Sequence, residues 1–250
     1  RSLVMSFDKV IAASHDVLCD KFFSNLRALC YSGYVFGYHG GPVCSTWSPA
    51  LWKQPGPVPL RTREYPFQKP GLSAEQIKKC DRGSELFLRH IDLKLGVLKH
   101  NGRATTEHPS DRRVSPFASV FATPQMTSLL GKYDGCITTF DQCMKGAPTR
   151  KRTDLSGVLE GLQSFNSLCN HLGGHGQCVG LGADGKFVTK AHEAYPSDMC
   201  RDLALLYVKS FACSESHKHC PTCLSPVPAA FFGINSVLPT GLHRAGSTGS

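Results

Sequence analysis

Three short stretches of the sequence carry side chains that can do chemistry, and each follows a segment of strand-like composition. Cys44 lies in the turn GGPVCSTWS after the apolar stretch YVFGY, and Glu107 follows RATT. Arg150 and Arg152 come shortly after CITTF. A thiolate can add to an electron-poor ring, a carboxyl group can hold or donate a proton, and guanidinium groups can fix a ring or its phosphates. If these groups converge, they indicate nucleophilic attack on a heteroaromatic ring.

Each of these residues also has an ordinary structural interpretation. Cys44 could be a small buried residue in a turn, since cysteine is among the residue types most often buried. Glu107 could cap a neighbouring helix or pair with Arg103, and the run RKR could be a solvated surface segment. The residues alone leave both interpretations open.

Two groupings of cysteine and histidine could bind a metal ion. Thiolates and imidazoles are the ligands that zinc prefers in a tetrahedral site, although the spacing of the first group matches none of the common zinc-finger patterns. We predict a zinc site at the first group and keep the second as an alternative. The first group is Cys169, His171, His175 and Cys178, and the second is Cys213, His217, His219, Cys220 and Cys223.

Composition limits the class of protein. A chain of 250 residues with 41% hydrophobic and 19% charged residues is typical of one folded domain with appendages. Its longest apolar runs fall short of the ~20 residues that cross a bilayer, so no membrane span is predicted. Twelve cysteines without a secretory leader indicate reduced thiols and an intracellular protein. The formal charge of +9 favours polyanions such as nucleic acid as partners.

The first part of the chain reads as alternating strands and helices. LVMSF predicts a short strand ending at Asp8, spacing predicts a helix over 20–31, and SGYVFGY predicts a strand. Residues 48–71 contain six prolines and should form an irregular loop. Ser73 and Gln76 form a capping box at the start of a long helix. The next predicted elements are a strand over 103–109, a helix over 115–130 interrupted near Pro124, and a strand over 134–140.

This order predicts an α/β fold with a doubly wound, mostly parallel sheet covered on both faces. In such sheets ligands collect at the carboxyl ends of the strands, which is where Cys44, Glu107 and the arginines are expected. Further predictions are a helix over 156–169, a hairpin over 176–189, a last helix over 195–212 and a flexible tail. We therefore divide the chain into an α/β domain (1–155), an extension of the same domain (156–213) and the tail (214–250).

Three motifs resemble those of the cytosine-5 DNA methyltransferases. GGPVCSTWS is similar to their nucleophile loop G-P-P-C-x-x-F-S, TEHP to their E-N-V or E-N-P motif, and KGAPTRKR to G-V-P-Q-x-R-x-R. The motifs stand in the family's order between residues 8 and 155. The resemblance implies a Rossmann-like fold in which Cys44 attacks C6 of cytosine and Glu107 contacts N3. It also implies that Arg150 and Arg152 lie around the thiolate and the base.

The same resemblance implies a site for S-adenosylmethionine. Asp8 would hold the ribose of the cofactor, Asp16 would lie at its adenine, and Pro42 of the nucleophile loop would border it. The family's first strand and glycine-rich turn would precede Asp8, so we expect a fold that is incomplete at its N-terminus. Val43 replaces the family's second proline and His108 its asparagine.

A closer resemblance is to methyltransferase-like domains within protist retroelement polyproteins, which share PLRTREYP, LSAEQIKK, FDQCMKGAP and AYPSDMC, up to about residue 211. It implies methyl transfer to DNA cytosine through a Cys44 adduct in an intact parent protein, with DNA as partner and the nucleus as location. Two alternatives come from other classes of protein. One is a catalytically inactive nucleic-acid-binding module, and the other is a zinc-stabilised structural domain of a polyprotein.

Overall fold

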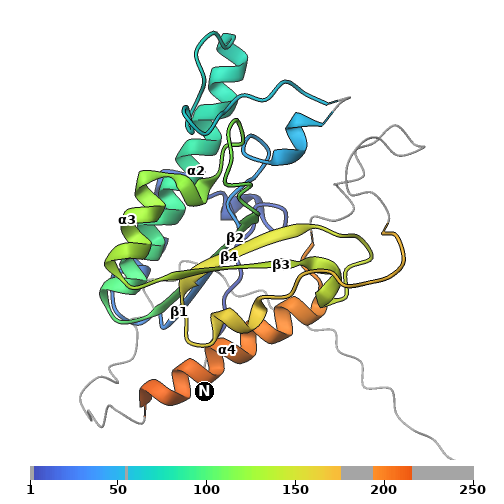
Figure 1. Cartoon of the computed structure of the whole chain (residues 1–250). Coiled ribbons are helices and arrows are strands. Elements are labelled where there is room, and N and C mark those ends of the chain that lie inside the picture. Colours follow the sequence, from blue (N-terminus) through green and yellow to red (C-terminus); the bar gives the residue numbers. More distant parts are fainter. Residues whose placement is uncertain (1–2, 54–55, 176–193, 216–250) are drawn as a thin grey trace, which may run out of the picture. The chain divides into compact units, whose positions relative to one another are not determined.

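The computed structural model describes residues 3–53, 56–175 and 194–215, which are coloured in Figure 1. All of them belong to the first of two compact units, which covers residues 1–219. The hairpin predicted over 176–189 and the predicted tail beyond Glu215 lie outside the described residues, as do the side chains of Cys178 and of the second Cys/His group.

A four-stranded mixed sheet forms the centre of the described region (Figure 1). Its strands are β1 (Gly37–Gly40), β2 (Arg103–Pro109), β3 (Cys136–Asp141) and β4 (Arg152–Val158), in the spatial order β1-β2-β4-β3. Strand β1 runs parallel to β2, whereas β4 is antiparallel to both β2 and β3.

The α/β class is thus confirmed, but the prediction of a mostly parallel, doubly wound sheet is wrong for these strands. Only η4 (Gln142–Lys145) and a short loop connect β3 to β4. A parallel pair needs a long crossover connection, whereas a short one reverses the chain direction. Strand β4 therefore returns antiparallel and inserts between β2 and β3.

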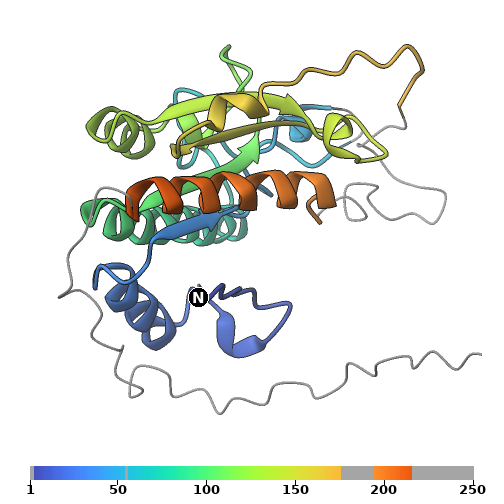
Figure 2. The same ribbon diagram turned by 90° about the horizontal axis from the view of Figure 1, so that it is seen from below.

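Helices cover both faces of the sheet. On one face lie α2 (Ala74–Lys99) and α3 (Pro124–Lys132), and on the other lie η5 (Leu162–Phe165) and α4 (Ser197–Glu215), which runs along the sheet in Figure 2. Helix α1 (Asp20–Cys30) packs against α2. Because side chains alternate between the faces of a strand, neighbouring residues of one strand belong to different sides of the molecule.

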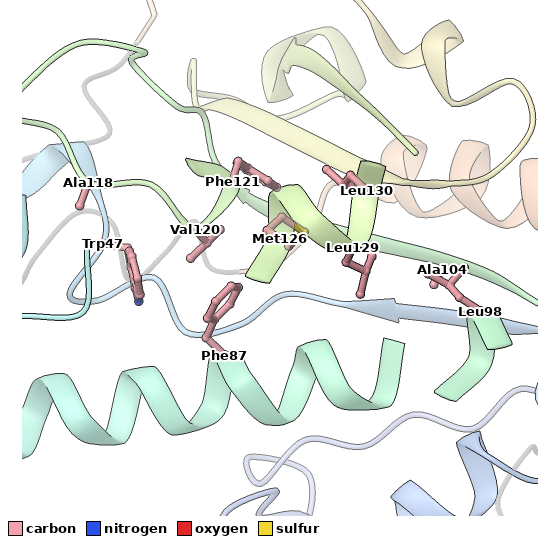
Figure 3. Close-up of a cluster of buried hydrophobic side chains, with 10 residues drawn as sticks. All are labelled: Trp47, Phe87, Leu98, Ala104, Ala118, Val120, Phe121, Met126, Leu129 and Leu130. Atoms are coloured by element: carbon pink, nitrogen blue, oxygen red, sulfur yellow. The ribbon is translucent and has the colours of Figure 1, made fainter. Parts of the chain in front are cut away.

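The larger apolar cluster lies between the sheet and the helices α2 and α3 (Figure 3). A second cluster, built around Phe140, Leu155 and Met199, joins the other face to η5 and α4. The larger cluster consists of Trp47, Phe87, Leu98, Ala104, Ala118, Val120, Phe121, Met126, Leu129 and Leu130.

Local signals in the sequence explain where the helices begin. The Ser73 side chain accepts from the Gln76 amide at 3.3 Å and the Gln76 side chain accepts from the Ser73 amide at 2.9 Å, which confirms the capping box. Pro124 does not interrupt a helix but begins α3, behind Thr123 as N-cap. The remaining short helices are η1 (Ala13–His15), η2 (Pro49–Trp52) and η3 (Val120–Ala122).

Two predicted elements are wrong. Residues 3–7 form no strand, and residues 156–169 form the end of β4 followed by η5 rather than a helix. The spacing of Leu159, Leu162 and Phe165 is helical, but the preceding residues are buried on both faces as part of β4. Gly157 allows β4 to pack this closely against β2, since a Cβ there would clash with the carbonyl oxygen of Ala104.

A search of the described helices for a bilayer-spanning segment, one both long enough and sufficiently apolar, found none.

The buried guanidinium of Arg61 fixes the proline-rich loop. It donates to the Thr46 hydroxyl at 2.8 Å and to the Cys80 carbonyl at 2.6 Å, and it stacks over the Trp47 ring at 4.1 Å. Burial lowers the pKa of Arg61 to about 10. Arg61 therefore joins the loop to α2 and to the turn that carries Cys44.

Candidate metal centre and the rim of the sheet

The stretches with chemically capable side chains meet at one rim of the sheet. The carboxyl ends of the parallel strands β1 and β2 lie at this rim, and the amino end of the antiparallel β4 joins them, with Pro109 paired to Thr153. The turn after β1, the end of β2 and the segment before β4 are therefore neighbours. They carry Cys44, Glu107 and Arg150, respectively, and Arg152 is the first residue of β4.

Glu107 is a buried carboxyl group at this rim, with only 6% of its surface exposed. Its Oε2 accepts a hydrogen bond from the Tyr195 hydroxyl at 3.2 Å, and Lys151 Nζ lies 3.8 Å from Oε1. Burial raises the pKa of Glu107, while Lys151 and the Tyr195 hydrogen bond act to lower it. Arg103, the partner considered from the sequence, pairs with Glu160 instead.

Cys44 is half-buried in the turn after β1, and its carbonyl accepts from the amides of Trp47 and Ser48, both at 2.9 Å. This turn passes close to Glu107. A Cβ on Gly41 would clash with the Tyr195 hydroxyl and would lie 3.5 Å from Glu107 Oε2.

The thiol and the carboxyl group share Tyr195 as a neighbour. Burial raises the pKa of Tyr195, and the charges of Glu107 and Cys44 raise it further. The sequence did not predict that Tyr195 and Lys151 contact Glu107, although Tyr195 stands in the motif AYPSDMC and Lys151 in the run RKR.

The two predicted arginines do not point to Glu107. Arg152 donates from Nε to Asp141 Oδ1 and from Nη2 to Oδ2, both at 3.0 Å, and Arg150 Nε donates to Oδ2 at 3.1 Å. Lys151, which stands between the two arginines just before β4, turns instead to Glu107, with Nζ 3.8 Å from Oε1. Lys151, rather than either arginine, therefore provides the positive charge beside Glu107.

The residues predicted to hold S-adenosylmethionine do not fit that cofactor. Asp8 Oδ1 accepts the Val10 amide at 2.8 Å, and Asp16 Oδ1 accepts the Leu18 amide at 2.9 Å, so both carboxylates close turns of their own segment. Neither follows a strand of the sheet. Pro42 lies half-buried in the turn after β1.

Four side chains form a candidate metal centre beside β3. One ligand atom from each of Cys143, Cys169, His171 and His175 lies within 4.8 Å of all the others. Cys169 Sγ is 3.3 Å from His171 Nδ1 and 3.0 Å from His175 Nε2. Three of these residues were predicted from the sequence. Cys143, in η4, was not, because it stands far from the others along the chain.

The thiols of this cluster differ in their ionisation. Hydrogen bonds from the His171 amide, the His171 ring and the His175 ring lower the pKa of Cys169 to about 6. Burial, with the neighbouring Cys169, raises the pKa of Cys143 to about 11. Ionisation of the Cys169 thiol is thus favoured over that of Cys143, and a bound cation would favour ionisation of both thiols.

Asp141 connects this cluster to the sheet. Its side chain is fully buried, and its Oδ2 accepts the backbone amide of Cys169 at 2.9 Å. Its own amide donates to the Ser167 carbonyl at 2.9 Å, and Phe140 forms a bridge to Ser167. These contacts hold the segment after η5 along the end of β3, where Cys169 meets Cys143.

A polar cluster lies buried between α2 and β2. Lys94 Nζ donates to Thr106 Oγ1 at 3.0 Å, and the His90 ring lies between the Tyr38 hydroxyl at 2.7 Å and the same Thr106 hydroxyl at 2.8 Å. Burial lowers the pKa of Lys94 to about 7, and burial also lowers the pKa of His90. The helical spacing of α2 gave no sign of this cluster.

Comparison of the chain with protein-family models, with curated proteins and with solved structures found no match, so none of these comparisons shows a family for it.

Proposed function

We propose that this chain is a zinc-stabilised structural domain, and that its formal charge of +9 serves to bind nucleic acid. The observation that carries the proposal is the cluster of Cys143, Cys169, His171 and His175, whose ligand atoms lie within 4.8 Å of one another. Zn–S bonds of ~2.3 Å and Zn–N bonds of ~2.0 Å separate the ligands of a tetrahedron by about 3.3–3.8 Å. The side chains need only a small rearrangement to reach these separations.

The donor set favours zinc and a structural role. Two sulfur and two imidazole ligands suit Zn²⁺ and are poor ligands for Mg²⁺ or Ca²⁺, which take oxygen. Four protein ligands leave no open position for a substrate, and that is typical of structural rather than catalytic zinc. The ion would join η4 to the segment after η5, two parts of the chain that are otherwise connected through Asp141 and Ser167.

The zinc content of the purified protein tests this proposal. We expect about one zinc ion bound at this centre per chain after dialysis against metal-free buffer, measured by plasma mass spectrometry. Cys143→Ser should lose that ion, whereas Cys200→Ser, an exposed thiol outside the cluster, should keep it. A second ion at the group over 213–223 would persist in Cys143→Ser. A protein without zinc, or a Cys143→Ser variant with unchanged zinc content, would contradict the proposal.

The variant Cys178→Ser distinguishes the two ligand sets. The sequence predicted Cys178 as the fourth ligand, whereas the described residues bring Cys143 to the other three. If Cys143 is the ligand, Cys178→Ser retains the full zinc content. If both variants lose zinc, both cysteines contribute to the centre.

A second candidate is the chemistry of the cytosine-5 DNA methyltransferases. What favours it is the proximity of the Cys44 turn and Glu107, which both border Tyr195 at one rim. The Cys44 sulfur would add to C6 of a cytosine-like ring, and Glu107, whose pKa burial raises, would hold a proton at N3. Because Asp8 and Asp16 do not fit S-adenosylmethionine, we derive no methyl-transfer step.

Covalent trapping tests the second candidate. DNA that contains 5-azacytosine should form a complex with the protein that survives denaturing electrophoresis. The complex should disappear in Cys44→Ser and persist in Cys19→Ser, an exposed thiol in another part of the chain. Absence of any complex with the unmodified chain would reject this candidate and leave the zinc proposal intact.

A further inference from the structure

The buried carboxylate of Asp141 belongs both to the metal cluster and to an arginine pair. Its Oδ2 accepts from the backbone amide of Cys169, a metal-ligand candidate, and from Arg150 and Arg152. Its side chain has no exposed surface, whereas those of Arg150 and Arg152 are 49% and 40% exposed. One buried anion therefore orients two outward guanidinium groups.

The hydrogen bonds to Asp141 leave the outer edges of both guanidinium groups available. Arg150 uses Nε alone, and Arg152 uses Nε and Nη2. Within the described part of the chain, the Nη atoms of Arg150 and Nη1 of Arg152 have no hydrogen-bond partner. Guanidinium groups with fixed orientation and free N–H groups match the oxygens of a phosphate.

More positive charge follows along the same rim. The Ser110 amide donates to the Arg152 carbonyl at 3.2 Å, and the Asp111 amide donates to Asp154 at 2.9 Å. The next two residues, Arg112 and Arg113, are exposed. Two further exposed arginines therefore follow within a few residues of the backbone contact with Arg152, and a polyanion with repeated phosphates needs such additional positive charge.

We infer that the metal centre, acting through the Cys169 amide and Asp141, positions Arg150 and Arg152 as a binding site for the phosphodiester oxygens of nucleic acid. This inference rests on the zinc-stabilised, nucleic-acid-binding function proposed above and adds how its two parts are linked.

The link follows from the position of Cys169. A metal ion fixes its sulfur, and with it the amide that covers Asp141. Without the ion the segment over 169–175 loses one attachment to Cys143 and keeps only the backbone contacts of Ser167 and Cys169 with the end of β3, so we expect the Asp141 carboxylate to become more accessible to water. Ion pairs that are exposed to water contribute little to stability, so the arginines would be held less firmly in one orientation.

Fluorescence anisotropy with a labelled DNA duplex of about 20 base pairs tests the arginine site. With zinc-loaded protein, the double variant Arg150→Ala/Arg152→Ala should bind the duplex at least about tenfold more weakly. Its plot of log K against log salt should also be less steep, by about two units of slope. The matched double variant Lys78→Ala/Arg82→Ala removes the same charge from the exposed surface of α2. It should change the affinity less than about threefold. Equal losses in the two double variants would overturn the site.

The variant Asp141→Asn tests the link itself. It keeps the four metal ligands and raises the formal charge by one, so a diffuse electrostatic attraction predicts tighter DNA binding. Positioning by Asp141 predicts the opposite, a loss of about tenfold that approaches the loss in the arginine double variant. DNA binding by Asp141→Asn that equals or exceeds that of the unmodified protein would overturn the inference.

Zinc content and thermal unfolding, measured on the same samples, separate the possible failures. A chain that lacks zinc refutes the proposed function. A chain that holds zinc but whose Asp141→Asn variant binds DNA normally refutes only the link. If Asp141→Asn does not fold, removing zinc by chelation at a temperature where the protein stays folded provides the same comparison. The unmodified protein should then lose affinity, whereas Arg150→Ala/Arg152→Ala should not weaken further.

Discussion

Lys94 Nζ lies 3.0 Å from the Thr106 hydroxyl, its only hydrogen-bond partner among the described residues, although the side chain is fully buried. No carboxylate faces this amine from α2 or β2. The Thr106 hydroxyl also contacts the His90 ring, and burial is what lowers the pKa of Lys94. The protein therefore keeps this lysine close to neutrality, and that should make its stability depend on pH.

We predict that stability rises with pH above neutrality. The pKa of Lys94 is about 7 in the folded state and 10.5 in the unfolded state, so the unfolded chain binds more protons between these values. The destabilisation is full below pH 7 and decreases as pH rises toward 10.5, by on the order of 3–5 kcal/mol over that range. Urea unfolding at pH 7, 8 and 9 would measure it.

Lys94→Met should remove most of this slope and stabilise the protein at pH 7. Lys79→Met, on the exposed surface of the same helix, should leave the slope unchanged. If the urea midpoint of the unmodified protein is flat from pH 7 to 9, Lys94 is charged in the fold and the interpretation fails.

Glu107 should destabilise the fold at neutral pH. Its pKa is raised by burial, and its Oε1 has no hydrogen-bond partner among the described side chains. The folded state therefore prefers the protonated acid, and stability falls as pH rises through the folded pKa. Glu107→Gln should stabilise the protein at pH 7 by about 1–2 kcal/mol, whereas the exposed Glu64→Gln should change little. A lower denaturation midpoint for Glu107→Gln would show that the carboxylate is better paired than Lys151 and Tyr195 indicate.

Metal removal should lower the melting temperature by roughly 10 °C or more, because binding energy at a structural centre is folding energy. Differential scanning calorimetry with and without a chelator measures this shift. Cys143→Ser should melt at the temperature of the chelated protein and should not respond to the chelator. A melting temperature that the chelator leaves unchanged in the unmodified, zinc-containing protein would exclude a structural role.

Replacing each of two glycines by alanine should change the stability of the protein in opposite directions. Gly157 on β4 lies against the backbone of β2, where a Cβ would clash with the Ala104 carbonyl oxygen, so Gly157→Ala should cost on the order of 3 kcal/mol. Gly131 in α3 has open space around it, and Gly131→Ala should stabilise by about 1 kcal/mol. Denaturant unfolding of the two variants measures these changes and tests the placement of β4 against β2. A tolerated Gly157→Ala would contradict the register of β4 with β2.

The features that could be predicted from the sequence are those set by residues close together along the chain. The capping box of Ser73 and Gln76 sets the start of α2, and Cys169, His171 and His175 lie within one short segment, so their types and spacing suffice. Cys143 could not be found in this way, because it joins them only through the contact between the end of β3 and Ser167. Likewise, nothing local to β4 reveals that it inserts between β2 and β3.

At the rim, residue types indicated a thiol and an acid near each other, but their side-chain directions depend on register. Lys151 reaches Glu107, whereas Arg150 and Arg152, one on each side of it in the sequence, turn to Asp141. The burial of Lys94 was also beyond prediction, since lysine is almost never found fully buried without a partner.

The central place of β4 has a consequence for how the chain folds during synthesis. Strands β2 and β3 emerge from the ribosome before β4, and although β2 can pair with β1, its other edge and the whole of β3 have no partner strand until β4 follows. Until residue 158 has left the exit tunnel, the nascent chain exposes unpaired strand edges of the kind that promote aggregation. Completion of the sheet is therefore a late event, and we expect a ribosome stalled before this point to carry a chain with exposed strand edges.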